Sequence, residues 1–297
     1  STGTAVLVKN TTDYLDTYYT STGAGSVSNI GPFIAREAGT LGNSLKISIC
    51  PNSTAFGPHS MSGNLVADAS ASIGDTTITV DDGSLMQVGD ILEFGDATST
   101  PSTSGAPSGF YYKITAISTH VLTIARFNPA TGTTEAGGLR HAVADDAKML
   151  RHWEYYFNFS NAPTTTDDVA AAGGSLDEMH IAVIDEDGEI SGTVGTILET
   201  FEGVSQAHDA KTAQGSSNYY PNVLYTQSKF IYWVDHIATL SDGLAKKGTT
   251  FDNTVGDAFV ISSTSLASGT DDFAATNGEI ATAYEKFADV DAVDLSL

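Results

Sequence analysis

Three short acidic turns hold the side chains whose types and spacing come nearest to a chemical site. They are Asp185-Glu186-Asp187-Gly188, Asp81-Asp82-Gly83 and Asp271-Asp272. The first begins like a calcium loop, but an EF-hand has its glycine at the sixth position and Gly188 comes too early. Paired carboxylates cleave glycosides when they face each other across a cleft, and adjacency in the sequence does not supply that geometry. We therefore interpret all three stretches as turns.

The histidines, serines and cysteine form no motif of a catalytic or metal site. The seven histidines are scattered, and no two have the i,i+4 spacing of a helical zinc motif. No Gly-x-Ser-x-Gly elbow and no Gly-Lys-Ser/Thr phosphate loop is present, although a Ser/His/Asp triad stays an open alternative in so serine-rich a chain. Cys50 is the single cysteine and lies in an apolar run, which predicts a buried thiol and excludes an internal disulfide. The sequence thus predicts no enzyme and no catalytic, cofactor-binding or metal-binding residue.

The charge balance excludes several partners. Acidic residues number 36 and basic residues 13, for a net charge of −23. Nucleic acids and anionic lipids are bound by clustered Lys and Arg, and Lys246-Lys247 is the only adjacent basic pair. No apolar run reaches 18 residues, so we expect no membrane span. The chain begins at Ser1 and ends within a strand-like pattern at 292–297, from which we expect an excerpt of a longer polypeptide.

The elements around these turns are expected to mix strands and helices. Apolar runs at Phe33–Ala35 and Leu45–Cys50 flank a loop with Gly39, Gly42 and Asn43, which predicts a hairpin. Residues 179–184, an Asp-Gly turn and the residues from Glu189 onward predict a second hairpin. Further expected elements are strands at 5–8, 153–159, 196–204, 230–234, 258–261 and 292–297, helices at 10–19, Tyr220–Gln227 and 278–288, and a loop or short helix at 163–175.

Residues 61–146 differ from the rest of the chain. Short alternating strands at 75–80, 87–94, 110–117 and 120–127 are separated by Gly, Asp and Ser turns, with no helical period. This pattern is typical of a small all-β barrel or sandwich. Residues 51–60 are interpreted as a linker. The sequence therefore predicts a mixed α+β fold: a discontinuous α/β domain at 1–60 and 147–297, with an inserted β-barrel-like domain at 61–146.

Three stretches carry a resemblance to contractile phage tail sheath proteins of the T4-like myovirus family. Residues 31–50 are similar to a segment with an aromatic and aliphatic run, an Ala-Gly pair, Leu-Gly-Asn and a second strand. Residues 179–236 resemble the family's next block, in which an acidic turn and a Gly-Thr-x-Gly-Thr-like step precede a Tyr-rich helix and an aromatic strand. Residues 270–297 resemble the run into its central α/β domain. The resemblance covers about two thirds of the chain.

The resemblance implies a structural protein of the virion, assembled in the host cytoplasm, whose polymer surrounds a tail tube and contracts during genome delivery. Its implied partners are other sheath subunits, the tail tube protein and the baseplate. The module at 61–146 departs from the family core and is expected to be an insertion on the outer surface. The family's amino-terminal arm and carboxy-terminal domain are not matched, so we expect this chain alone not to polymerise.

Two alternatives from other classes remain open. The first is a surface β-domain that binds carbohydrate or acts as an adhesin, for which Phe110, Tyr111 and Tyr112 would have to form an exposed aromatic platform. The second is a hydrolase that uses the Asp-rich turns, for which two carboxylates would have to meet in a cleft.

Overall fold

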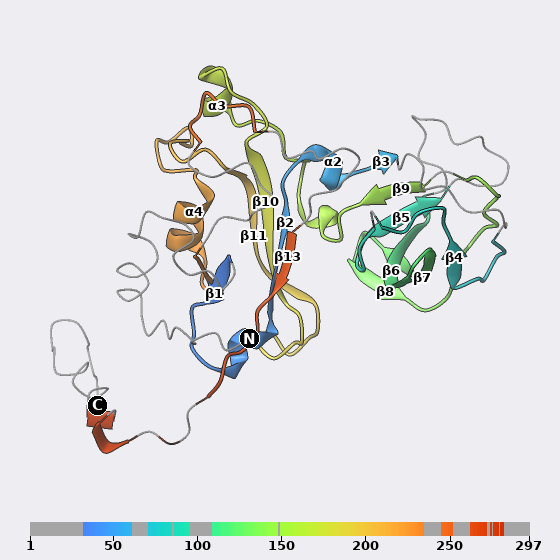
Figure 1. Ribbon diagram of the computed structural model, residues 1–297, viewed down its shortest axis with the longest axis horizontal. Coiled ribbons are helices and arrows are strands. Elements are labelled where there is room, and N and C mark those ends of the chain that lie inside the picture. Colours follow the sequence, from blue (N-terminus) through green and yellow to red (C-terminus); the bar gives the residue numbers. More distant parts are fainter. Residues whose placement is uncertain are drawn as a thin grey trace.

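The computed structural model describes residues 32–60, 71–84, 86–94, 109–147, 149–234, 245–251, 262–271, 274, 276–278 and 280–281. These residues form two β-rich bodies that lie side by side (Figure 1). Their sheets are antiparallel, their helices are few and short, and none of their sheets is closed. The expected mixture of helices and strands is thus confirmed, and strands predominate over helices. The elements expected at 5–8, 10–19, 258–261 and 292–297, and most of the helix at 278–288, lie outside the described residues.

The first body is built on a four-stranded sheet, which we call the core sheet. Its strand order is β11-β10-β2-β13, and all neighbours are antiparallel. The bounds are Leu45–Cys50 for β2, Glu178–Asp185 for β10, Thr196–Ser205 for β11 and Ser262–Ser265 for β13. Both faces of β2 and β10 are covered, which explains why their sequences are nearly continuous apolar runs rather than clean alternations.

One face of the core sheet packs against a two-stranded sheet and a helix. The two strands are β1 (Phe33–Ala35) and β12 (Ile231–Trp233), and the helix is α4 (Tyr220–Gln227), which has the predicted bounds. Among the described residues, the buried side chains of this cluster lie in the stretches 33–49 and 179–233, and the partly buried Leu266 packs against them: Phe33, Leu45, Ile47, Ile49, Met179, Ile181, Val183, Phe201, Val204, Tyr219, Tyr220, Val223, Leu224, Ile231 and Trp233. These two stretches therefore fold as one unit.

The first predicted hairpin is wrong in its pairing, and the second forms with a longer connection than predicted. β1 pairs with β12, whereas β2 pairs with β10 and β13, and a 3-10 helix, η2 (Thr40–Ser44), lies between β1 and β2. The second hairpin joins β10 to β11 through residues 186–195, so its returning strand begins at Thr196 and not at Glu189. Periodicity identifies an apolar strand, but the choice of its neighbour depends on burial between segments far apart in the chain.

The second body, which we call the module, is a seven-stranded sheet. Its order is β3-β9-β5-β6-β7-β4, with β8 also paired to β7. The bounds are His59–Ser60 (β3), Thr77–Thr79 (β4), Ile91–Phe94 (β5), Tyr111–Ser118 (β6), Val121–Asn128 (β7), Thr133–Glu135 (β8) and Met149–His152 (β9). Its inward side chains, among them Ile78, Leu92, Ile114 and Leu122, form a separate buried cluster.

The module and the segments that flank it differ from the expectations in four ways. Its sheet is open rather than a closed barrel, and it includes residues 59–60 and 149–152 beyond the expected range of 61–146. The expected linker at 51–60 contains α2 (Ser53–Phe56) and β3. The expected aromatic strand at 153–159 is instead a compact turn with η3 (Tyr156–Asn158), because Trp153, Tyr155 and Phe159 fold back onto the second face of the core sheet. The short helix α3 (Asp167–Ala171) lies within the predicted 163–175.

Candidate functional site: the junction between the two sheets

The three acidic turns do not come together in one site. Asp82 accepts a hydrogen bond from the backbone N–H of Ser84, and this bond lowers the pKa of its exposed carboxyl. Asp271 lies elsewhere and accepts from the N–H and hydroxyl of Thr40 at 2.9 and 2.5 Å, which lowers its pKa. Asp272 lies outside the described residues. Asp82 is thus engaged within its own turn, whereas Asp271 is engaged by a residue far away in the chain.

Asp185 is the most heavily bonded of these carboxylates. It is fully buried and accepts from the hydroxyl of Ser44 at 2.5 Å, the N–H of Gly188 at 3.1 Å, the N–H of Ile190 at 3.0 Å, and the N–H and hydroxyl of Ser191 at 2.6 and 2.7 Å. Burial opposes ionisation, but the bonds from Ser44, Ser191 and Ile190 outweigh it and lower the pKa of Asp185 to about 2. Asp185 therefore organises the 186–195 loop, and its oxygens are occupied by protein donors.

The Gly39–Asn43 loop holds the chain that follows β13. Asn43 donates to the carbonyl of Gly269 at 3.0 Å and accepts from its N–H at 2.7 Å. The Thr40–Asp271 bonds lie beside this pair. A Cβ on Gly39, whose φ is +128°, would lie 2.5 Å from Asp271, so only glycine fits there. We call this arrangement the clasp.

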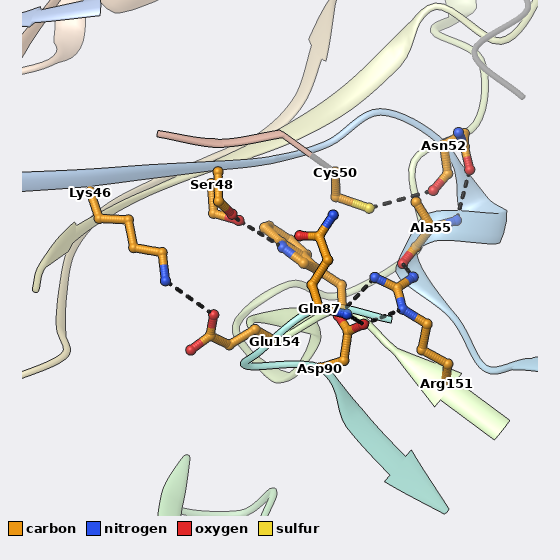
Figure 2. Close-up of polar contacts among 11 residues, drawn as sticks. Lys46, Ser48, Cys50, Asn52, Ala55, Gln87, Asp90, Arg151 and Glu154 are labelled. Carbon is orange, nitrogen blue, oxygen red and sulfur yellow. Dashed lines mark hydrogen bonds and ion pairs between the residues drawn. The ribbon is translucent and has the colours of Figure 1, made fainter. Parts of the chain in front are cut away.

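Several buried charged side chains lie where the module meets the core sheet, and we call this region the junction. Arg151 of β9 is fully buried and makes a bidentate ion pair with Asp90, with both N–O distances 2.8 Å. Burial raises the pKa of Asp90, and the guanidinium of Arg151 and the N–H of Gln87 oppose that rise. Arg151 also donates to the carbonyl of Ala55 in α2 at 3.2 Å, so one side chain binds both bodies (Figure 2).

Further contacts reinforce the junction. The indole N–H of Trp153 donates to the hydroxyl of Ser48 in β2 at 3.0 Å, and its backbone N–H donates to Phe56 at 3.0 Å. Glu154 pairs with Lys113 of β6 at 2.8 Å. It also contacts Lys46 of β2 at 3.5 Å (Figure 2). Cys50 is buried on the same face of the core sheet, and burial raises the pKa of its thiol, as predicted for a structural cysteine.

A second buried pair lies one residue along β9. His152 Nε2 is 2.8 Å from Oε1 of Glu93 in β5, with the two side chains 6% and 2% exposed. The imidazole stacks on Tyr156 at 4.6 Å between ring centroids and meets the edge of Tyr111 at 5.9 Å. The junction thus buries two acidic and two basic side chains: Asp90, Glu93, Arg151 and His152.

The other candidate side chains are distributed through the two bodies. His180 stacks on Phe159, accepts from the N–H of Gly203 and contacts the carbonyl of Asn161, which agrees with a packing role. Tyr112 is fully buried and Phe110 is 38% exposed, so the 110–112 aromatics do not share one exposed face. Among the residues that the structure describes, no three His, Cys, Asp or Glu side chains are grouped as metal ligands would be.

Sequence reasoning missed the junction. Asp90 and Arg151 lie 61 positions apart, and nothing local relates them. One signal was present: Arg151 interrupts the apolar and aromatic stretch 149–159, and a charge in such a stretch needs a buried partner.

Comparison with protein-family models, with curated proteins and with solved structures gives no match for this chain. No helix in the described part of the chain has the length and apolar character needed to cross a membrane.

Proposed function

We propose that the protein is a structural subunit of a contractile phage tail sheath, located in the virion and packed around a tail tube. Its partners in this proposal are neighbouring sheath subunits, the tube protein and the baseplate. It catalyses no reaction, and its work is done by rigid-body rearrangement of packed subunits.

One observation carries the proposal. Two described stretches with the resemblance, 33–50 and 179–233, supply the buried side chains that the structure describes in the cluster on one face of the core sheet. The departing segment forms its own sheet with its own buried cluster. A family core with a separate inserted body is the arrangement that the resemblance predicts.

The junction supports a mechanical role. The Arg151 side chain binds Asp90 in the module and Ala55 in α2, and Trp153 binds Ser48 of the core sheet. A bidentate buried ion pair and an indole hydrogen bond fix orientation, because each has narrow geometry. A body held in this way moves with the core rather than swinging on a linker, which suits a subunit whose neighbours rearrange together.

The test is negative-stain electron microscopy of the complete gene product that contains this chain. Regular tubes or stacked rings are expected, and they should form more readily as salt is raised, because salt screens the repulsion between subunits of net charge −23. Small monodisperse particles at every salt concentration would contradict the proposal. If such particles instead bind glycans or cell surfaces, the alternative of a surface binding module is favoured.

A further inference from the structure

β13 is a short and polar strand at the edge of the core sheet. Among the described strands it pairs only with β2, at the end of the sheet (Figure 1). Its sequence is Ser-Ser-Thr-Ser, so it adds no apolar side chain to the sheet, and Ser263 and Ser265 are exposed. β2 has a strand on each side and is almost completely buried. Segments with few buried apolar contacts open at a low cost in free energy, so we expect β13 to leave the sheet while β2 stays in place.

Two side-chain hydrogen bonds in series connect β13 to the junction. Ser263 lies directly opposite Ser48 of β2, and their hydroxyl oxygens are 3.0 Å apart. The Ser48 oxygen also accepts from the indole N–H of Trp153 at 3.0 Å. Ser48 is 1% exposed, and the described residues give its hydroxyl no third partner. Because buried donors are nearly always bonded, the Ser48 hydroxyl donates to Ser263, and the bonds run from Trp153 through Ser48 to Ser263.

Trp153 lies where the chain leaves the module. It directly follows β9, and its backbone N–H donates to the carbonyl of Phe56 at 3.0 Å. Its indole is 1% exposed and packs on Phe159 with 5.1 Å between the ring centroids, in the cluster on the second face of the core sheet. The bond to Ser48 is the polar contact that fixes the orientation of this indole against β2.

We propose that β13 is a releasable strand that controls how firmly the turn at Trp153 is held. While β13 is paired, Ser48 donates to Ser263, and a hydroxyl that donates is polarised to accept more strongly from the indole. When β13 leaves the sheet, Ser48 loses this acceptor, and the indole is held by a weaker bond. The coupling is reciprocal, so a loosened indole also favours the release of β13. This device lies within one chain and does not depend on the proposed sheath function.

The experiment uses the whole chain and measures hydrogen exchange of its two indole N–H groups by NMR, with the two resonances assigned through Trp233→Phe. Trp233 is an internal reference, because its indole donates to Tyr220 in the cluster on the other face of the core sheet. Ser263→Ala removes the acceptor of Ser48 and keeps the backbone pairing of β13. We expect exchange at Trp153 to rise about fivefold to tenfold, as for the loss of one hydrogen bond, and exchange at Trp233 to stay unchanged.

Ser265→Ala is the matched control for Ser263→Ala. Ser265 lies two residues along the same strand, on the same face, opposite Lys46, and no described residue bonds its hydroxyl. This variant should change the exchange of neither indole. An unchanged Trp153 in Ser263→Ala, or equal acceleration of both indoles, would overturn the proposal.

A second variant loosens β13 without a change at Ser263. Asn43→Ala removes the two bonds to Gly269 in the clasp, and the amides of β13 should then exchange faster. Exchange at the Trp153 indole is expected to rise with them, and adding Asn43→Ala to Ser263→Ala should give no further rise at Trp153. Faster exchange in β13 with an unchanged Trp153 indole would show that the strand and the turn are not coupled.

Discussion

Replacing Asp185 with asparagine tests whether one buried carboxylate organises the end of the core sheet. Its Oδ1 accepts from Ser44 and Gly188, and its Oδ2 accepts from Ile190 and twice from Ser191. Asparagine has one acceptor oxygen, so its best orientation keeps the three bonds at the Oδ2 position. The amide NH₂ then faces the N–H of Gly188, and both groups are donors.

The Ser44 hydroxyl cannot readily reverse its role, because it already accepts from the N–H groups of Asp187 and Glu189. Two charge-assisted bonds are therefore lost, at about 1.5–3 kcal/mol each. We expect Asp185→Asn to lower the free energy of unfolding by about 4 kcal/mol, a large share of the roughly 5–15 kcal/mol typical of a folded domain.

The assay is urea unfolding of the whole chain, followed by far-UV circular dichroism. Asp187→Asn is the matched control: it removes an exposed carboxylate from the same loop and should change stability by less than about 0.5 kcal/mol. The pH dependence gives a second check. Because the pKa of Asp185 is lowered to about 2, its stabilisation is present above the ordinary pKa of about 3.9 and is lost as the pH falls toward 2. A loss below about 1 kcal/mol in Asp185→Asn, or equal losses in both variants, would refute the reasoning.

Three further changes probe the junction and the clasp. Arg151→Met leaves Asp90 as an unpaired buried carboxylate and should lower the free energy of unfolding in urea by about 3–5 kcal/mol. Adding Asp90→Asn should restore part of that loss, and no recovery would argue against a stabilising ion pair. Asn43→Ala removes the two bonds that the Asn43 side chain makes to Gly269, so amide exchange in the chain after β13 should rise about tenfold while that of β10 stays unchanged. Gly57→Ala places a Cβ 2.4 Å from the Arg151 carbonyl oxygen at a φ of +90°. It should lower Tm well below that of Gly74→Ala, where φ is similar at +94° but the added Cβ meets no atom within 4 Å.

Several elements of both bodies were predictable because their signals are local. β2 and the β5, β6 and β7 strands of the module follow apolar or alternating runs bounded by turn residues, and α4 begins with Pro221 in its first turn, where proline is tolerated. These signals act over a few residues, and the structure has the predicted type of element at each of these positions.

The pairings and the junction were not predictable for the opposite reason. β1 takes β12 as its neighbour, nearly two hundred positions away, because Phe33 and Trp233 share one buried cluster. The aromatic pattern of residues 153–159 is typical of a strand. The chain turns tightly there instead, because Trp153 and Phe159 both pack on the core sheet. Such choices depend on surfaces that exist only after other segments have folded.

The pairing of β3 with β9 has a consequence for the size of the module. Ser60 lies opposite Leu150, and partners in an antiparallel ladder have Cα atoms about 5 Å apart. The chain therefore enters the rest of the module at Ser60 and leaves it at Leu150, two neighbouring points. Because the pairing fixes the distance between these points, the rest of the module is connected to the core body as the tip of a long hairpin is connected to its stem. Residues can be added to or removed from the part of the module far from β3 and β9 without changing that distance, and a short turn between β3 and β9 would span it.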